Sequence, residues 1–341
     1  MKVLVTGHLG YIGAVMVPML QEAGFDITGL DSDLYRNCTF LNKPVKIKEK
    51  IKDIRDIDHK DVEGFDAIIH LAALSNDPLG NLNPNLTYDI NLHASVKLAQ
   101  LSKEVGVDRY LFSSSCSLYG AAGNRIMDES APFNPVTPYG ESKIKVEQEV
   151  SKLADKNFSP VFMRNTTAYG LSPRLRFDIV VNNLVAWAYT TKRIYLKSDG
   201  SPWRPLVHIS DISRAFIEVL KAPRKIIHNQ AFNVGINAEN YQIKDIAEMV
   251  KDVVPGCTIE YAEDAGPDKR SYQVDFTKLK NTFPGYKPEW TVRKGIEELY
   301  DAYQGVKFTP DDFEGPRFKR IAQIAMLLDE KKLDLNLRWI N

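Results

Sequence analysis

The chain has few cysteines, no long apolar run and no excess of either charge. Its three cysteines (Cys38, Cys116 and Cys257) are far apart and form no CxxC pair, so we expect neither a zinc site, or any other metal site, nor a disulfide framework. Reduced thiols are typical of a cytoplasmic protein, and we expect that location. Every apolar run is shorter than the ~18 residues that a membrane-spanning helix needs, and the run after Met1-Lys2 is only as long as a strand. We therefore expect no membrane segment and no signal peptide.

Charge is balanced along the 341 residues, with 44 lysines plus arginines against 44 aspartates plus glutamates. A chain without a large excess of positive charge is not expected to attract nucleic acid or an anionic membrane surface. A polyanionic ligand would have to be held by a local cluster of residues. The length suits two lobes with a full core, or one large domain with insertions.

Short β-rich runs alternate with helical patterns through the first half of the chain. This alternation predicts βαβ units, and hence an α/β fold with a Rossmann-type, doubly wound parallel sheet. The expected strands are Lys2–Thr6, Asp26–Leu30, Val45–Lys48, Ala67–His70, Arg109–Ser113 and Pro160–Arg164. The expected helices between them are Tyr11–Ala23, Pro84–Val105 and Pro138–Lys156.

After about Ala168, prolines interrupt the pattern and predict a smaller, discontinuous second lobe. A helix over Ile209–Ala222 and a strand over Gln230–Val234 are expected to return to the first lobe, and Phe318–Leu337 has an amphipathic helical pattern. The expected division is a first lobe of residues 1–170 plus about 207–234, a second lobe of about 171–206 plus 235–305, and a C-terminal helical extension of 306–341.

Three glycines, Gly7, Gly10 and Gly13, follow the apolar run of residues 3–5 and open a helix. Their GxxGxxG spacing presents backbone N–H groups and a helix N-terminus to a pyrophosphate. Asp31 lies 18 residues after Gly13, at the end of the second strand. A carboxylate there accepts both ribose hydroxyls and repels a 2′-phosphate, which favours NAD over NADP. The alternative is that Asp31 only caps the following turn.

Further candidates for the NAD site lie in the same turn and at two other strand ends. They are Tyr11 and Ile12 in the turn, Asp53 and Ile54 after the third strand, and Leu71, Ala72 and Ala73 after the fourth. Small residues at a strand end let the backbone approach a ligand closely. Taken alone, either strand end favours ordinary strand-end structure over a ligand contact.

Tyr139 and Lys143 lie one helical turn apart, so their side chains share a face. A lysine ammonium beside a phenol stabilises the phenolate and lowers its pKa from about 10. Such a tyrosine could take a proton from a sugar hydroxyl while hydride leaves the same carbon. The serine run 113–117 follows the fifth strand, at the edge where open α/β sheets bind ligands. The alternatives are a solvated helix face and a hydroxyl-rich turn.

In this order and spacing, the glycine turn, Asp31, the serines before Tyr119-Gly120 and the Tyr139…Lys143 pair resemble one family. It is the extended short-chain dehydrogenase/reductases, specifically their nucleotide-sugar epimerase/dehydratase group, and the resemblance runs from Met1 to about Tyr303. It implies an NAD-binding Rossmann domain, a small lobe for a nucleoside-diphosphate sugar, and a catalytic triad of Ser115, Tyr139 and Lys143. It also implies a homodimer.

The resemblance assigns further positions. It implies cofactor contacts at Asn91 and Ser113, and substrate contacts at Ser75, Cys116, Ser117, Thr167, Asn182, Arg204 and Arg270. The chain departs from the family pattern at three of its phosphate-binding positions. Thr167 replaces an asparagine, Pro205 an aspartate and Ala265 an arginine.

Two residues bear on the type of reaction. Family 4,6-dehydratases have an Asp-Glu pair directly after the triad hydroxyl, whereas this chain has Cys116 and Ser117. The missing carboxylates favour a 4-epimerase, which needs only the tyrosine, the cofactor and room for a 4-keto sugar to rotate. The alternatives within the family are a dehydratase that uses Cys116 as a weak acid and a 4-keto-sugar reductase. A cofactor-sensing protein without activity would be expected to have lost Tyr139 or Lys143.

Overall fold

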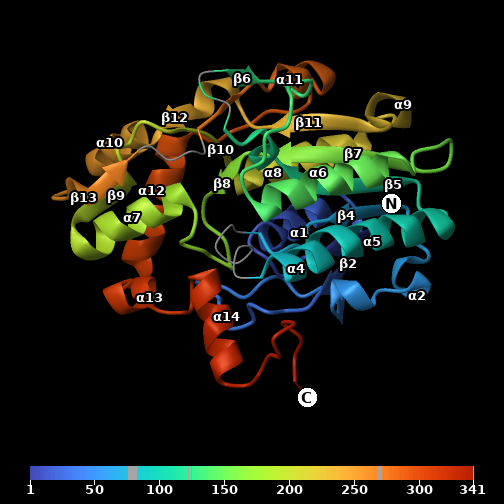
Figure 1. Ribbon diagram of the computed structural model, residues 1–341, viewed down its shortest axis with the longest axis horizontal. Helices are drawn as coiled ribbons and strands as arrows, with labels where there is room; N and C mark the ends of the chain where they lie inside the picture. Colours follow the sequence, from blue (N-terminus) through green and yellow to red (C-terminus); the bar gives the residue numbers. More distant parts are fainter. Residues whose placement is uncertain (76–82, 122, 124, 267–270, 341) are drawn as a thin grey trace.

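The computed structural model describes residues 1–75, 83–121, 123, 125–266 and 271–340. A seven-stranded sheet carries helices on both faces, and a smaller lobe lies beyond one end of its strands (Figure 1). The predicted Rossmann-type α/β fold is confirmed.

The sheet is parallel throughout, in the order β11-β7-β5-β4-β1-β2-β3. Its strands are β1 (Lys2–Thr6), β2 (Asp26–Asp31), β3 (Lys48–Ile51), β4 (Ala67–His70), β5 (Arg109–Ser115), β7 (Ser159–Asn165) and β11 (Gln230–Val234). From β1 the chain runs outward first to β3 and then, from β4, in the opposite direction. The carboxyl ends of β1 and β4 are therefore the switch point where such sheets bind ligands.

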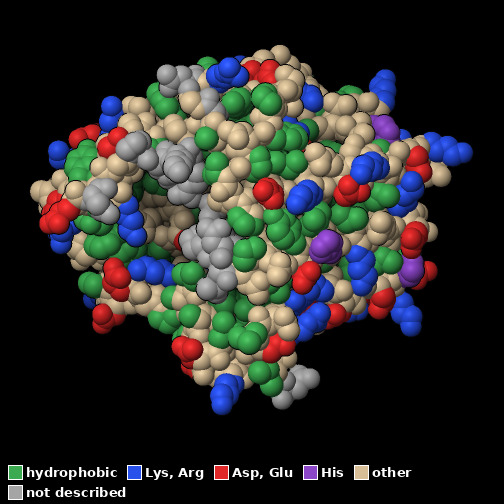
Figure 2. All heavy atoms as spheres, in the orientation of Figure 1, with side chains coloured by type: hydrophobic (Ala, Val, Ile, Leu, Met, Phe, Trp, Pro, Cys, Tyr) green, Lys and Arg blue, Asp and Glu red, His purple; other side chains and the backbone are tan. Residues whose placement is uncertain are grey.

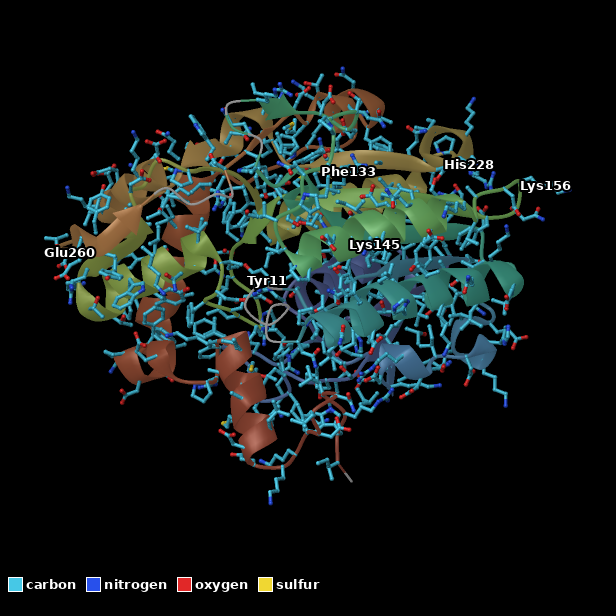
Figure 3. All side chains as sticks on the ribbon, viewed as in Figure 1. Tyr11, Phe133, Lys145, Lys156, His228 and Glu260 are labelled. Carbon is cyan, nitrogen blue, oxygen red and sulfur yellow. The ribbon has the colours of Figure 1, made fainter. Side chains whose placement is uncertain are left out.

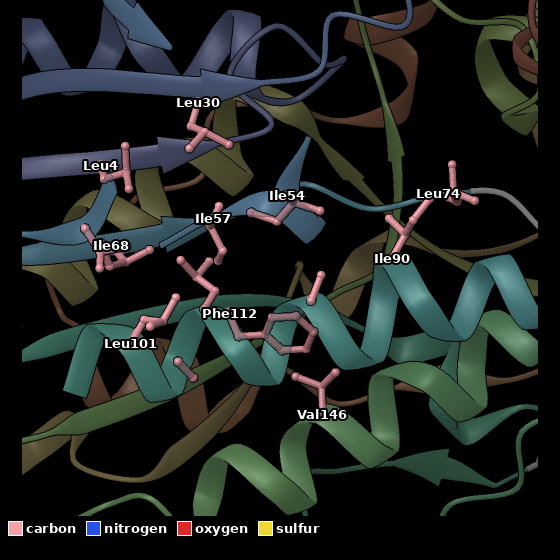
Figure 4. Packing of buried hydrophobic residues seen from close by; sticks show 14 of the residues in the cluster. Leu4, Leu30, Ile54, Ile57, Ile68, Leu74, Ile90, Leu101, Phe112 and Val146 are labelled. Atoms are coloured by element: carbon pink, nitrogen blue, oxygen red, sulfur yellow. The ribbon is translucent and has the colours of Figure 1, made fainter. Parts of the chain in front are cut away.

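Helices cover the two faces of the sheet. On one face lie α4 (Pro84–Thr87), the π-helical turn η2 (Tyr88–His93), α5 (Ala94–Glu104) and α6 (Pro138–Ser151). On the other face α1 (Gly13–Glu22) packs against α8 (Ile209–Lys221). Figure 4 shows how Leu4, Leu30 and Ile68 from the strands meet Leu101 and Val146 from the helices.

Four sequence-based boundaries need correction. The third strand is not Val45–Lys48 but β3, an edge strand whose residues are mostly polar and exposed. The helix expected over Pro84–Val105 contains the π turn η2. The helix expected to reach Lys156 ends at Ser151. In the C-terminal pattern only α14 (Arg320–Asp329) is helical.

Among the described residues, the second lobe contains two small sheets and three longer helices, and its β14 (Gln273–Val274) pairs with β6 (Ile126–Met127) in a further two-stranded sheet. Its first sheet joins β8 (Thr167–Tyr169), β10 (Trp203–His208) and β12 (Asn240–Gln242), and its second joins β9 (Arg193–Ser198) and β13 (Thr258–Gly266). The helices are α7 (Val180–Thr191), α10 (Ile243–Val253) and α12 (Val292–Val306). The remaining elements are η1 (Ile54–Asp56), α2 (His59–Val62), η3 (Cys116–Tyr119), α9 (Arg224–Ile227), η4 (Asn237–Glu239) and α11 (Thr277–Thr282).

The C-terminal extension contacts both lobes. Its short helix α13 (Pro310–Glu314) places Phe313 against Phe177 of the second lobe, with ring centroids 5.4 Å apart. Ile324 and Leu327 of α14 join the core of the first lobe. Across the described residues, no helix combines the length and apolar character that crossing a membrane requires.

Candidate active site

A cavity of about 1250 Å³ lies at the carboxyl ends of the central strands, between the sheet and the second lobe. Figure 2 shows the surface hollowed on this side of the molecule, with acidic and basic side chains interspersed over the visible face. The glycine turn, the serines after β5, Tyr139 and Lys143 line the cavity from the first lobe. The topology thus brings together motifs that are more than 100 residues apart in the sequence.

The glycine turn is packed tightly against the end of β4. Gly7 has φ +76°, and a Cβ on it would lie 2.6 Å from the backbone nitrogen of Ala72. A Cβ on Gly13 would lie 2.4 Å from the carbonyl oxygen of Gly7. Gly10 lines the cavity with bare backbone. The N–H groups of Gly7, Leu9 and Gly10 are bonded within the protein, whereas those of Tyr11, Ile12 and Gly13 have no hydrogen-bond partner among the described residues. These three N–H groups at the start of α1 fit a pyrophosphate.

We expect the Gly7→Ala variant to lose roughly 3 kcal/mol or more of unfolding free energy and to bind NAD poorly. The substitution combines backbone strain with contact against rigid backbone. Urea unfolding and NAD titration measure both effects. Gly24→Ala is the matched control, since Gly24 has φ +88° with no atom within 4 Å of its Cβ position. This variant should lose only the unfolding free energy that the backbone strain costs, about 1–2 kcal/mol. Equal losses in the two variants would contradict the packing argument.

Asp31 lines the cavity at the end of β2. Its two carboxylate oxygens accept the backbone N–H groups of Leu9, at 3.0 Å, and of Asp33, at 2.8 Å. Burial raises the pKa of this carboxyl, and the two N–H donors oppose that rise. Asp31 therefore caps the turn, as the alternative interpretation held, and also presents a carboxylate to the expected position of the ribose.

The other expected NAD residues divide into two groups. Those that line the cavity are Tyr11, Ile12, Asp53, Ile54, Leu71, Ala72, Ala73 and Ser113. The carboxylate of Asp53 is bound by Arg55, with Nη2 and Oδ2 2.5 Å apart. Asn91 is not among the residues that line the cavity, so its contact with the cofactor stays a prediction. Its amide bonds the backbone N–H and C=O of Leu74, and it acts by holding the loop after β4.

Tyr11 joins the two lobes and lies between them in Figure 3. Its hydroxyl donates to the carbonyl oxygen of Gly170 at 2.7 Å and accepts from Asn182 at 3.2 Å. Asn182 is fully buried and also bonds the backbone N–H of Gly170. It does not line the cavity, so the prediction that it binds substrate gains no support from the structure. The neighbouring Asn183 does line it.

Ser115, Tyr139 and Lys143 all line the same cavity, as a catalytic triad requires. Ser115 ends β5, and the Thr137 side chain caps α6 so that Tyr139 lies in its first turn. Lys143 is buried, and its Nζ donates to the carbonyl oxygen of Ser113 at 2.7 Å. The same Nζ lies 5.5 Å from the ring centroid of Tyr139. Burial lowers the pKa of Lys143 to about 7.

Two buried polar atoms in residues beside the triad have no hydrogen-bond partner within the described residues: Ser117 Oγ and Asn165 Oδ1. Both residues line the cavity. Asn165 faces Ser115 across the sheet and donates its amide to Ser113 Oγ at 2.9 Å. A ligand hydroxyl would satisfy these atoms, whose burial is otherwise unfavourable. The sequence indicated Ser117 but gave no signal for Asn165.

Cys116 faces the core instead. Its thiol donates to the carbonyl oxygen of Arg164 at 3.0 Å, and the side chain is fully buried and does not line the cavity. Burial raises the pKa of this thiol well above its ordinary value. The structure gives no support to the prediction that Cys116 contacts substrate, because its side chain is bonded within the core while that of Ser115 lines the cavity.

The remaining predicted substrate residues, Ser75, Thr167 and Arg204, line the cavity, while Arg270 lies outside the described residues. Ser75 Oγ accepts from Arg176 at 2.9 Å. Sequence analysis missed the aromatic wall of the second lobe and the part of the C-terminal extension that reaches the cavity. These residues are Trp187, Tyr195, Phe313, Glu314, Lys319, Arg320, Ile321 and Leu337. They carry no motif, and only the fold brings them to the site.

The family model of the NAD-dependent epimerase/dehydratase family matches residues 3–235 of this chain. The chain belongs to that family. NAD is the cofactor of the family, and the glycine turn and Asp31 fit it.

Relatives of this chain include both epimerases and dehydratases. It is similar to UDP-glucose 4-epimerase of Lactobacillus helveticus, with 31% identity over 85% of this chain and 92% of that protein. It is also similar to dTDP-D-glucose 4,6-dehydratase of Mus musculus, with 24% identity over 89% and 88%. The fold resembles that of UDP-glucuronic acid 4-epimerase from Bacillus cereus, solved with UDP-glucuronic acid and NAD. The TM-score is 0.76, with 23% identity over 90% of this chain and 100% of that one.

Proposed function

We propose that this protein is an NAD-dependent nucleotide-sugar 4-epimerase that acts through a transient 4-keto sugar, as a homodimer in the cytoplasm. The observation that carries the proposal is that the cavity holds Ser115, Tyr139 and Lys143 together, while the residue after Ser115 is a thiol facing the core. The site therefore offers Tyr139 as a base for the sugar hydroxyl, but no carboxylic acid at the position after Ser115 that dehydration would use.

In this proposal Tyr139 takes the proton of the C4 hydroxyl, and Ser115 donates a hydrogen bond to the C4 oxygen. Bound NAD supplies the hydride acceptor and later the hydride donor. Lys143 stabilises the phenolate of Tyr139. The 4-keto sugar rotates in the cavity, and Tyr139 then returns the proton to the C4 oxygen. The cavity of about 1250 Å³ is wide enough for a nucleotide sugar beside a dinucleotide.

The carboxylates of the cavity support epimerisation over loss of water. Among the described lining residues, the carboxylates are Asp31, Asp53, Asp178 and Glu314. Asp31 ends β2, Asp53 follows β3, Asp178 is paired with Arg176, and Glu314 ends α13. Neither η3 nor α6, which flank the reacting groups, contributes one. Dehydration across C5–C6 needs an acid and a base at that point.

The test is incubation of the protein as purified with UDP-, dTDP-, GDP- and CDP-sugars, followed by mass spectrometry and chromatography. We expect one nucleotide sugar to be converted to an isomer of equal mass without added NAD or NADH. A product 18 Da lighter would show dehydration, and stoichiometric consumption of NAD(P)H would show reduction. Either result would contradict the proposal.

We expect the Cys116→Ala variant to keep its turnover within about threefold of wild type. The variant loses only a buried thiol contact, at a cost of about 1–2 kcal/mol in unfolding free energy. Steady-state kinetics and urea unfolding measure the two effects. A loss of activity beyond about 100-fold in a folded variant would restore the thiol-dependent dehydratase as the better hypothesis.

A further inference from the structure

The C-terminal extension brings one buried arginine to the cavity. Arg320, the first residue of α14, is 3% exposed and lines the cavity. Its guanidinium carbon lies 4.0 Å from the ring centroid of Tyr35, and Nη2 donates to the carbonyl oxygen of Arg174 at 2.8 Å. Figure 1 shows α14 on the same side of the molecule as the loops that follow the N-terminal strands.

Two neighbouring buried arginines have carboxylate partners, whereas Arg320 has none in the described part of the chain. Arg174 pairs with Asp33, and Arg176 pairs with Asp178. Arg320 Nη1 is buried without any hydrogen-bond partner among the same residues. A buried guanidinium that lacks an anion is unfavourable by several kcal/mol. Burial accordingly lowers the pKa of Arg320, and Arg176 adds to the effect.

The surroundings of Arg320 place it at the cofactor end of the cavity. Tyr35 belongs to the loop that follows Asp31, and Ser32 of that loop lines the cavity. The indole N–H of Trp339 donates to the carbonyl oxygen of Ser32 at 2.7 Å, so the chain after α14 is bound to the same loop. Arg204, the arginine predicted to contact substrate, lines the cavity instead from β10 of the second lobe.

We propose that Arg320 binds a phosphate of NAD, so that the extension outside the matched family region completes the cofactor site. A phosphate accepts two parallel N–H donors of a guanidinium, which satisfies Nη1 and neutralises the buried charge. The inference rests on NAD as the cofactor of the family and is independent of the reaction proposed above. It explains why a segment beyond residue 306 is attached to the loop after β2.

The test compares ligands with and without phosphate. Adenosine, ADP and NAD displace NADH from the full-length protein, and NADH fluorescence gives their affinities. We expect Arg320→Met to lower the affinity for ADP and for NAD by about 10- to 100-fold and to leave the affinity for adenosine within about twofold of wild type. The reason is that the charge-assisted hydrogen bond of Arg320 is made to phosphate only. Arg317→Met is the matched control, since Arg317 lies in the same segment, is half-exposed and bonds the carbonyl oxygen of Thr39. It should leave all three affinities unchanged.

Two outcomes would overturn the proposal: an equal loss of affinity for adenosine and ADP, which indicates packing, or no loss of affinity for ADP. Should Arg320→Met not fold, Arg320→Lys retains the charge without the fork, and the same excess loss for ADP over adenosine is expected at about 3- to 10-fold. These measurements need no turnover, so failure of the epimerase proposal leaves them interpretable.

Discussion

The Tyr139→Phe variant is expected to lose at least about 100-fold in kcat on every nucleotide sugar that the wild type accepts, while it still binds NAD. Removing the hydroxyl removes the proton acceptor, and general acid–base catalysis contributes about 10²- to 10⁴-fold. The ring itself remains, with its contact to the Lys143 ammonium. Steady-state kinetics on the accepted sugar, together with NADH displacement, separates the chemical step from cofactor binding.

Tyr88→Phe is the matched control for this variant. Tyr88 lies in η2 beside α6, and its hydroxyl donates to Glu141 at 2.5 Å outside the cavity lining. Loss of the Tyr88 hydroxyl is expected to change kcat by less than about threefold. If Tyr139→Phe retained wild-type turnover, Tyr139 would not be the base, and the enzyme assignment of this site would be wrong.

The elements that could be predicted from the sequence are those in which local pattern and tertiary burial agree. β1 and β4 are buried at every position except Lys2 because they lie in the centre of the sheet, each contains a run of three apolar residues, and their predicted bounds match the structure. β3 has the residues KEKI, which no periodicity distinguishes from a loop. Only pairing with β2 makes it a strand, so the prediction fell on the apolar Val45 and Ile47 instead.

The candidate site divides in the same way. Gly7, Asp31, Tyr139 and Lys143 could be found because the chemistry of each requires one residue type at a fixed distance along the chain. A side chain's direction at a strand end is set by the fold, so Cys116 was assigned to the cavity although it faces the core. The contribution of α14 could not be foreseen, because contact between residues 320 and 35 depends on how the lobes pack.

Lys143 lies beside the proposed base, with its Nζ 5.5 Å from the ring centroid of Tyr139. It is almost fully buried, and burial lowers its pKa from 10.5 to about 7. A phenolate at Tyr139 is stabilised when Lys143 is charged, and the burial of that charge is the cost. Catalysis and stability consequently oppose each other at this residue.

We expect Lys143→Met to lower kcat by at least about 100-fold and to alter how stability depends on pH. Because the folded-state pKa lies below the unfolded value, the unfolded chain binds more protons between pH 7 and 10.5. The wild type therefore gains stability as pH rises through this range, by roughly 2 kcal/mol between pH 7 and 9, and the methionine variant lacks that gain. Urea unfolding at several pH values measures the difference. Lys145→Met, on the exposed side of α6, should keep the wild-type slope. Parallel pH profiles for wild type and Lys143→Met would mean that Lys143 stays charged in the fold.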